Sequence, residues 1–334
     1  QAAGLLPDSP LVAVYRGQAL LRLGRNTEAL AEAQRASSAK ARRARVGIAQ
    51  DAGTSTVFLH SGEFFLHTVD LEIPGRGFNW KFERKYRSGI IFDGPLGHNW
   101  EFNYNRRLFV EASGTVIRMD GSGRADRYEL TGSGYRSPSG FYTRLARNSD
   151  GTFTERDRSG TKITYSTSSP SAQGIARMTE LRDRNGNRMR FEYNGQGQLV
   201  RVIDTLGRAI VYRYNSDKRL IEIEDFIGRK IRFEYDGNGD LRAVTSPSVT
   251  GTPNENDFPN GKTTRYLYSS GLSEERLKHK LLEITAPNEV ALGGPSRVKV
   301  EYDTNPASPN VGRVLRQIIG GINANGVPAG GTIS

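Results

Sequence analysis

The residues that could do chemistry in this chain are four histidines and a set of regularly spaced aspartates. The histidines are scattered and no cysteine is available, so the ligand spacing of a tetrahedral zinc site is absent. His98 lies in a glycine-rich motif, where we expect a hydrogen bond in a turn rather than metal ligation or catalysis. The sequence contains no Gly-x-Ser-x-Gly nucleophile motif and no phosphate-binding loop. The histidines are His60, His67, His98 and His279.

One aspartate recurs at the same place in three similar stretches, as Asp183, Asp204 and Asp225. General acid–base catalysis would need two carboxylates in different environments at one site, whereas turn chemistry alone predicts one carboxylate per stretch. Residues 236–240 begin like a calcium-binding loop, but Leu241 stands where the invariant glycine belongs, which favours a hairpin turn. We therefore predict no catalytic residue, no metal ligand and no cofactor.

These aspartates belong to a sequence repeat with a period of 21 residues. Each copy starts at a glycine, alternates apolar and polar residues up to a tyrosine, and continues through a polar turn to a leucine. Alternation with a period of two is typical of a strand with one buried face, and polar turn residues that tolerate positive φ allow the chain to reverse. The repeat positions are Gly186, Tyr193 and Leu199; Gly207, Tyr214 and Leu220; and Gly228, Tyr235 and Leu241.

Each copy therefore predicts a β-hairpin, and consecutive hairpins would join through a second tight turn that ends at the glycine. A repeat of this length is typical of a structural unit that stacks on its neighbours. Each copy would lengthen the sheet by roughly 10 Å and add one tyrosine to a row on its inner face. Residues 265–268 with 281–284, and 299–302 with 311–315, predict two more hairpins with longer inserts.

Upstream of the repeats, aromatic residues recur at every second position, as at Trp80 and Phe82 and again at Trp100 and Phe102. This spacing predicts strands whose aromatic side chains form a core. An alternative for Trp80 and Trp100 is that a sugar ring stacks on each indole.

These motifs resemble the Rhs/YD-repeat family, named for a Tyr-Asp pair followed by Gly-x-Leu. Residues 235–241 match that motif, whereas Tyr193 and Tyr214 are followed by asparagine and the second copy lacks the turn glycines. Upstream segments resemble the domain that opens an Rhs core, and the resemblance covers most of residues 60–303. The matching positions of this opening motif are Pro74, Gly75, Gly77, Tyr86, Gly97 and Trp100.

The resemblance implies a spiralling β-sheet shell that encloses a cargo, usually a variable C-terminal toxin, in a secreted or surface-exposed bacterial protein. Many Rhs proteins cleave themselves near the end of the core, but nothing in this sequence matches that distal segment. The implied partner is the rest of the same polypeptide, meaning further repeats and the enclosed C-terminal domain.

The first 38 residues predict two helices, with Pro10 and Gly24 at the ends of the first and Thr27 opening the second. They resemble a tetratricopeptide repeat, whose small and apolar positions match Gly17, Leu20, Ala29 and Ala36. A basic linker follows. The net charge is +11, and the first 50 residues hold eight Lys/Arg and three Asp/Glu. Nucleic acid or an anionic surface could neutralise such a segment. A solvated linker is favoured instead, because no aromatic residue is interleaved to stack on bases.

The bulk composition is that of a globular protein, with 36% hydrophobic and 25% charged residues. The absence of cysteine excludes disulfides, and no apolar run approaches the roughly 18 residues that span a membrane. The chain starts at Gln1 without a signal peptide and stops in a glycine-rich stretch, so we expect a fragment of a longer protein.

We predict a mainly β fold of stacked antiparallel hairpins in a spiralling sheet, preceded by a small helical hairpin. The expected function is structural and non-catalytic. The main alternative is a surface adhesion module that binds glycan or a partner protein, which requires exposed aromatics around Trp80, Trp100 or Tyr135. A hydrolase on a propeller-like scaffold would require convergent carboxylates. The expected domains are 1–38 (helical hairpin), 39–56 (basic linker), 57–160 (opening β-domain) and 161–334 (hairpin array).

Overall fold

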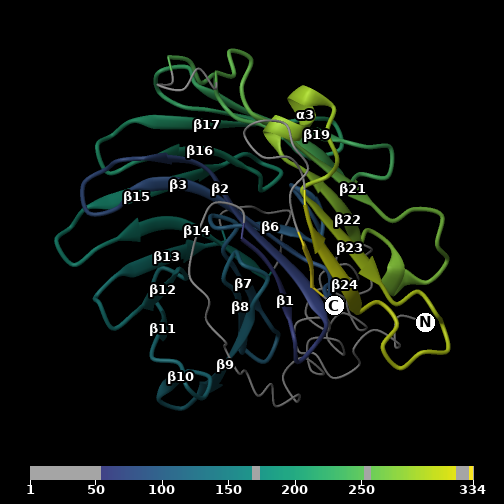
Figure 1. Cartoon of the computed structure of the whole chain (residues 1–334). Helices are drawn as coiled ribbons and strands as arrows, with labels where there is room; N and C mark the ends of the chain where they lie inside the picture. Colours follow the sequence, from purple (N-terminus) through teal and green to yellow (C-terminus); the bar gives the residue numbers. More distant parts are fainter. Residues whose placement is uncertain (1–53, 168–173, 252–256, 321–330, 334) are drawn as a thin grey trace.

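A computed structural model describes residues 54–167, 174–251, 257–320 and 331–333, and these residues are mainly β, as predicted (Figure 1). The predicted helical hairpin of residues 1–38 lies outside the described residues, as does the predicted linker up to residue 53. Residues 54–56, which the sequence assigned to that linker, instead begin a strand. In the described part, no helix is long and apolar enough to cross a membrane.

The first strands form a small antiparallel sheet, called here the opening sheet, with the order β1-β2-β3-β6. Every second residue of β3 is buried, as the aromatic spacing predicted. Strands β4 and β5 form a separate two-stranded ribbon, called here the β4–β5 ribbon. The strands are β1 (Thr54–Phe58), β2 (Glu63–Ile73), β3 (Trp80–Arg87), β4 (Asp93–Gly94), β5 (Gly97–His98) and β6 (Trp100–Phe102).

The strands from β7 onward belong to one large antiparallel sheet that closes on itself. Strand β7 makes the closure, because it pairs with β8 on one side and with the first residues of β14 on the other. The boundary predicted after residue 160 falls inside this sheet, between the paired strands β12 and β13. The division into domains stays a prediction.

The strands up to the repeats are β7 (Arg107–Val110), β8 (Val116–Met119), β9 (Ala125–Thr131), β10 (Gly134–Arg136), β11 (Arg144–Arg147), β12 (Phe153–Arg156), β13 (Lys162–Ser166) and β14 (Ile175–Arg182). The repeats and the strands after them are β15 (Arg188–Tyr193), β16 (Leu199–Ile203), β17 (Ala209–Tyr214), β18 (Leu220–Glu224), β19 (Lys230–Tyr235), β20 (Leu241–Thr245), β21 (Thr263–Tyr268), β22 (Leu281–Thr285), β23 (Val298–Tyr302), β24 (Val314–Ile319) and β25 (Gly331–Ile333). Among the described residues, the short helix η2 (Glu275–Leu277) lies in the insert between β21 and β22, and α3 (Pro287–Leu292) connects β22 to β23.

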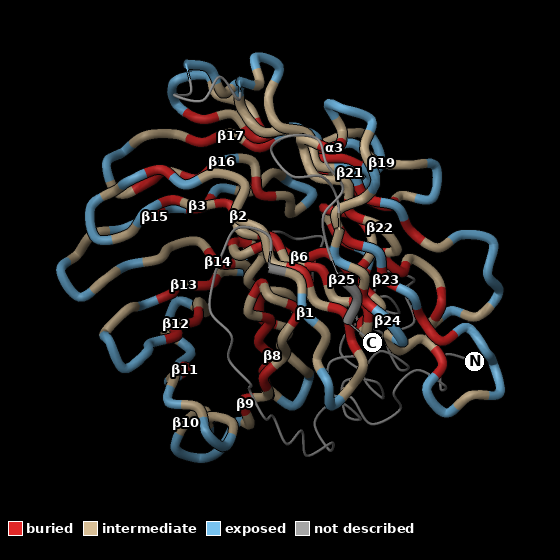
Figure 2. Tube along the Cα trace, viewed as in Figure 1, coloured by how far each residue is buried: buried red, intermediate tan, exposed pale blue. Residues whose placement is uncertain are grey.

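The opening sheet fills the hollow of the large sheet, and the two share one hydrophobic core (Figures 1 and 2). The ring of Phe82 lies 6.2 Å from that of Tyr212 and 5.7 Å from that of Phe233, between ring centroids. Trp80 and Trp100 are both 0% exposed. They belong to the core, and the alternative that they stack on a sugar is wrong.

A buried ion pair within the opening sheet also contacts the large sheet through one hydrogen bond. Arg84 interrupts the apolar side of β3 and is 1% exposed, yet its guanidinium donates to the Asp70 carboxylate at 2.6 and 3.0 Å. It also donates to the hydroxyl of Tyr266 in β21 at 2.7 Å. Burial alone would lower the pKa of Arg84, but Asp70 and Tyr266 raise it above its usual value. The charge is therefore kept inside the core, where it fixes the opening sheet against a late repeat strand.

The repeats fold as predicted into the antiparallel hairpins β15–β16, β17–β18 and β19–β20, and the two later hairpins β21–β22 and β23–β24 are also present. Each hairpin has a register shift at its tyrosine, for example between Arg213 and Tyr214. The shift places each tyrosine opposite the residue that starts the second strand, so Tyr193 pairs with Leu199 and Tyr214 with Leu220. The extra residue of each bulge lies in the second strand, as Val200 does in β16 and Ile221 in β18. The alternation of residue types gave no sign of them.

The repeat tyrosines form a ladder of hydrogen bonds that connects each hairpin to the one before it. Tyr214 donates its hydroxyl proton to the carbonyl of Leu199 at 2.9 Å, and Tyr235 donates to that of Leu220 at 2.7 Å. Burial raises the pKa of the Tyr214 hydroxyl, so the group stays protonated as a donor. Tyr193, Tyr268 and Tyr302 make the same bond to Met178, Leu241 and Leu281.

The aspartates at the repeat turns are used as turn residues. Oδ1 of Asp204 accepts the backbone N–H groups of Leu206 and Arg208, and its Oδ2 accepts the Arg208 guanidinium at 2.7 Å. Asp225 makes the equivalent bonds one repeat later. The turn glycines have positive φ, for example +80° at Gly207. These contacts are the turn chemistry predicted for the aspartates.

The first prediction concerns the tyrosine ladder. Tyr214→Phe should lower the free energy of unfolding by about 1–2 kcal/mol, because the buried carbonyl of Leu199 loses its partner. Tyr212 on the same strand is a matched control, because its buried hydroxyl makes no well-formed hydrogen bond within the described residues, although the Trp80 indole lies beside it. Denaturant unfolding should show little loss for Tyr212→Phe. Equal losses in the two variants would contradict the ladder.

The second prediction concerns the repeat turn that lacks glycine. Lys218 has φ +64° at the position where the neighbouring repeats carry Gly197 and Gly239. A left-handed backbone destabilises a residue that has a side chain by about 1–2 kcal/mol, and Lys218→Gly removes this cost. About half of that gain is lost again, because glycine has more conformational freedom than lysine in the unfolded chain. Lys218→Gly should therefore raise the free energy of unfolding by up to about 1 kcal/mol.

Gly207→Ala is the reciprocal test of the turn geometry. A Cβ at this position would meet nothing within 4 Å, so only its φ of +80° opposes the substitution. The variant should be destabilised by about 1 kcal/mol in the same denaturant titration. A neutral Gly207→Ala together with a destabilised Lys218→Gly would refute the conformational argument.

Candidate functional site

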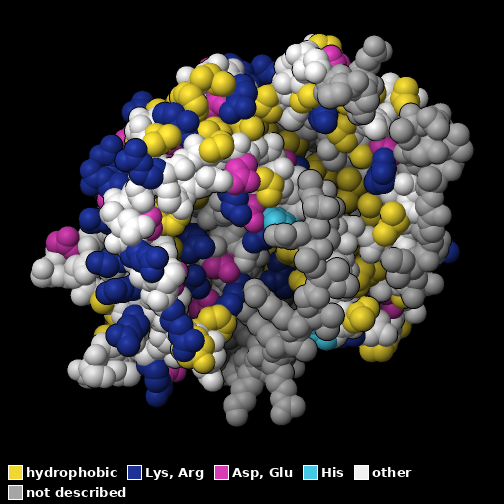
Figure 3. Space-filling model, turned by 60° about the vertical axis from the view of Figure 1, so that its left-hand side comes forward, with side chains coloured by type: hydrophobic (Ala, Val, Ile, Leu, Met, Phe, Trp, Pro, Cys, Tyr) yellow, Lys and Arg dark blue, Asp and Glu magenta, His cyan; other side chains and the backbone are white. Residues whose placement is uncertain are grey.

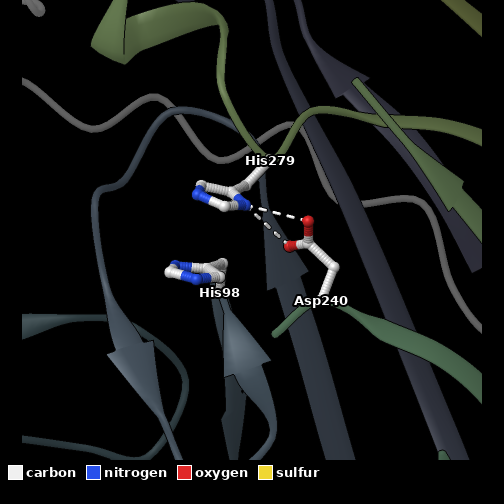
Figure 4. Close-up of side chains that lie close together, drawn as sticks. All are labelled: His98, Asp240 and His279. Carbon is white, nitrogen blue, oxygen red and sulfur yellow. Dashed lines mark hydrogen bonds and ion pairs between the residues drawn. The ribbon is translucent and has the colours of Figure 1, made fainter. Parts of the chain in front are cut away.

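The strongest cluster of chemically active side chains lies where the β4–β5 ribbon meets a repeat turn. His98 ends β5, Asp240 is the last residue of the turn before β20, and His279 precedes β22. These three residues come from distant parts of the chain and converge on one point (Figure 4). Within the described part of the chain, they are the one group of three histidine or carboxylate residues whose ligand atoms could share a metal ion.

The geometry of the cluster combines a hydrogen-bonded pair with a ring stack. Nδ1 of His279 lies 3.0 Å from Oδ1 and 2.9 Å from Oδ2 of Asp240. The imidazoles of His98 and His279 are stacked, with centroids 3.5 Å apart and ring planes inclined by 10° (Figure 4). Asp240 is 0% exposed, whereas both histidines are only partly buried. One side of the cluster therefore lies in the core and the other is accessible.

Glycine at position 97 is needed to bring His98 to this point. Gly97 has φ +84°, and a Cβ there would lie 2.5 Å from the carbonyl oxygen of Gly239. The ribbon is held in place by Pro95, whose carbonyl accepts the N–H of Leu220 at 2.7 Å and the hydroxyl of Tyr235 at 3.1 Å. The ribbon thus docks directly on the turns of the repeats, which aligns His98 with Asp240.

His279 is held in an unfavourable backbone conformation. Its φ of +57° lies in the left-handed region that residues with a side chain rarely adopt. The buried hydroxyl of Tyr86 donates to the carbonyl of His279 at 2.8 Å and accepts the N–H of Leu281 at 2.9 Å. Backbone strain of this kind persists only where the surroundings enforce it, and it is often found at functional sites.

The electrostatic surroundings favour a neutral ring at His98. Burial lowers its pKa, the Asp93 carboxylate opposes this, and the neighbouring ring of His279 lowers it further. Lys280 next to the cluster is also affected, because burial lowers the pKa of its ammonium group to about 8. Two imidazoles beside a buried carboxylate can bind a transition metal or exchange protons near neutral pH.

The other glycine-rich segment of the opening motif docks on the repeats in the same way. A Cβ on Gly77 would lie 2.4 Å from Oδ2 of Asp183, and one on Gly75 would lie 2.7 Å from Oγ1 of Thr205. The N–H of Arg76 donates to the same Thr205 oxygen at 2.7 Å. The guanidinium of Arg208 contacts the carbonyl of Pro74.

The residues singled out from the sequence therefore fall into two structural groups. Gly186, Gly207 and Gly228 lie in the turns between hairpins with positive φ, while the repeat tyrosines and leucines meet across the hairpins. Pro74, Gly75, Gly77 and Gly97 lie where the opening region meets the repeat turns, and Tyr86 and Trp100 lie in the core. Whether any of them has a role beyond this is untested.

Sequence reasoning did not bring His98 and His279 together, because they are 181 residues apart and no motif connects them. Asp240 was considered as part of an imperfect calcium loop and set aside in favour of a turn. Asp236 does hold that turn, since its Oδ1 accepts the N–H groups of Asn238 and Asp240. The side chain of Asp240, however, leaves the turn to meet His279. The prediction that the chain has no metal ligand stays a prediction.

A family model described as "Domain of unknown function (DUF6531)" matches residues 55–128, which span the opening sheet and the first strands of the large sheet. A search of curated proteins found no match. Several solved structures align with most of this chain, at low identity and with TM-scores below 0.5.

One of these structures is TcdB2-TccC3 without its hypervariable C-terminal region, with 12% identity and a TM-score of 0.33 over 80% of this chain. Another is the Photorhabdus luminescens Tc holotoxin pore with a TccC3 mutation, with 11% identity and a TM-score of 0.27 over 79% of this chain. This chain spans only 15% and 18% of those two proteins. A third is the N-terminal domain of the effector protein SpvB from Salmonella typhimurium strain LT2, with 14% identity and a TM-score of 0.26 over 80% of this chain and 99% of that one.

The third prediction tests what holds the cluster in place. Tyr86→Phe should cost about 2–4 kcal/mol of stability, because the His279 carbonyl and the Leu281 N–H both lose a buried partner. Tyr104→Phe, which removes a single bond to the N–H of Lys81, should cost about half as much. Hydrogen exchange at the Leu281 amide should accelerate in Tyr86→Phe. An amide that stays as protected as in the unsubstituted protein would refute the proposed support.

Proposed function

We propose that this chain is the non-catalytic opening of an Rhs-type β-shell, whose continuation encloses a C-terminal cargo in a secreted or surface-exposed bacterial protein. The observation that carries the proposal is the opening sheet inside the hollow of the large sheet. A shell that protects a cargo needs a closed end, and Trp80, Phe82 and Trp100 are fully buried in the core that the opening sheet shares with the large sheet. The sequence resemblance to Rhs cores and the family match over residues 55–128 agree with an opening role.

The repeats provide a means of extending such a shell. Each hairpin presents the carbonyl of the residue opposite its tyrosine, and the next hairpin donates its own tyrosine hydroxyl to it. The two later hairpins make the same bond although their inserts are longer. Because the same tyrosine bond attaches each new hairpin, the sheet can be extended one hairpin at a time to any length. A wall around a large space can be built in this way.

The chemistry of the described residues favours a structural role over an enzymatic one. Asp204 and Asp225 use both carboxylate oxygens within their own turns. Carboxylates occupied by turn contacts support a structural role, since a hydrolase on this scaffold would need two of them at one site. The adhesion alternative relied on exposed aromatics, but Trp80 and Trp100 are buried and the Tyr135 hydroxyl donates to the carbonyl of Gly114.

The proposal predicts that the shell protects a cargo from protease. Limited proteolysis of the full natural chain can measure this protection. The segment that follows the repeats should resist protease in the native protein and be degraded once the protein is unfolded. Electron microscopy of the same sample should show a hollow particle with one filled end. A C-terminal segment cut as fast in the native protein as in isolation would overturn the proposal.

Two glycine variants connect that protection to the opening region. Gly97→Val places a side chain against the Gly239 carbonyl and should loosen the ribbon from the repeats, so cleavage of the cargo should accelerate. Gly132→Val is the matched control, since a Cβ there meets nothing within 4 Å. Circular dichroism should first show that both variants keep their β-structure. Equal protection in a folded Gly97→Val would contradict a closing role for the ribbon.

A further inference from the structure

We propose that His98, Asp240 and His279 bind a divalent transition metal ion such as Zn²⁺, which ties the β4–β5 ribbon to the repeat sheet. This inference does not depend on the presence of a cargo. Two imidazoles and one carboxylate are a ligand set that zinc and its neighbours in the first transition row accept. Three protein ligands leave a fourth position for water, which suits a cluster with one accessible side.

The distance between His279 and Asp240 is already close to that of two ligands on one ion. Metal–ligand bonds of about 2.0–2.2 Å place two ligand atoms of a tetrahedral site about 3.3 Å apart. Nδ1 of His279 lies 2.9 and 3.0 Å from the Asp240 oxygens, with a proton between them. A metal ion would replace that proton and release it to solvent, as metal binding to histidine generally does.

His98 completes the set once its ring turns out of the stack. The ligand atoms of the three residues lie within 4.8 Å of one another, so His98 has to approach by at most about 1.5 Å to reach the spacing of a tetrahedral ion. The two rings are now parallel, and binding would turn them out of the stack so that their nitrogens converge. Both histidines are partly exposed, which leaves room for this rotation and for the ion to enter.

The surroundings position these side chains more firmly than an incidental surface contact requires. The buried Asp240 carboxylate points at His279, Tyr86 holds His279 in a left-handed conformation, and the contact of Gly97 with Gly239 sets the place of His98. The chain offers a useful contrast in His67, whose Nε2 lies 2.7 Å from Oε1 of Glu83 without belonging to such a group of three. That pair has a similar hydrogen bond but lacks the second imidazole.

The test is Zn²⁺ titration of the chelator-treated protein by calorimetry, with Co²⁺ absorption as a report on coordination. One ion should bind per chain, protons should be released on binding, and the thermal midpoint should rise with metal concentration. His98→Ala and Asp240→Asn should each weaken binding at least tenfold. His67→Ala is the matched control and should bind as the unsubstituted protein does. Equal losses in His67→Ala and His98→Ala would overturn the proposal.

A second measurement needs no variant, so it stands even if a substitution prevents folding. Histidine ring signals of the unsubstituted protein, followed by NMR during the Zn²⁺ titration, should move for two of the four histidines. Those two should be the pair whose rings show a mutual contact in the metal-free protein, as the stack of His98 and His279 requires. No saturable binding, or movement of the His60 and His67 signals alone, would show that the cluster is a hydrogen-bonded contact without a metal.

Discussion

The hydrogen bond from each repeat tyrosine to the preceding hairpin is the interaction on which the rest of the structure depends. Main-chain ladders would hold neighbouring strands together in any sheet, but the tyrosine bond fixes which residue of one hairpin lies beside which residue of the next. The bulge in the second strand of each hairpin sets the tyrosine opposite that strand's first residue, whose carbonyl accepts the bond from the next hairpin. A sheet built in this way keeps its register, because a slip would leave a buried carbonyl and a buried hydroxyl unpaired.

The opening sheet depends on that fixed register. Its glycine-rich segments approach repeat turns so closely that a Cβ would collide, at Gly77 with Asp183 and at Gly97 with Gly239. Contacts this close require that both partners be placed to within a fraction of an ångström. The His98, Asp240 and His279 cluster arises at one of these docking points, where the ribbon and two repeat strands meet. Its geometry is thus a consequence of how the sheet is closed at its start.

The sequence predicted the features that are local or periodic. The period of 21 residues identified the hairpins, and turn chemistry predicted the role of the aspartates. Both features involve residues that are near one another in the sequence. The burial of Arg84 with Asp70 and Tyr266 and the meeting of His98 with His279 were not predictable in this way. Each depends on which distant segments of the chain pack together, and residue types alone do not show which segments these are. The boundary predicted after residue 160 lies well before the regular repeats that start at Gly186, and β12 and β13 pair across it.

The most direct test of the ladder is native-state hydrogen exchange on Tyr214→Phe, resolved strand by strand. If the tyrosine bond couples hairpins, the amides of the preceding hairpin β15–β16 should lose protection together with those of β17–β18, because Leu199 receives the bond. Strands β21–β24, which keep their own tyrosine bonds, should stay protected. A loss of protection confined to β17–β18 would contradict the account and leave the main-chain ladder as the only connection between repeats.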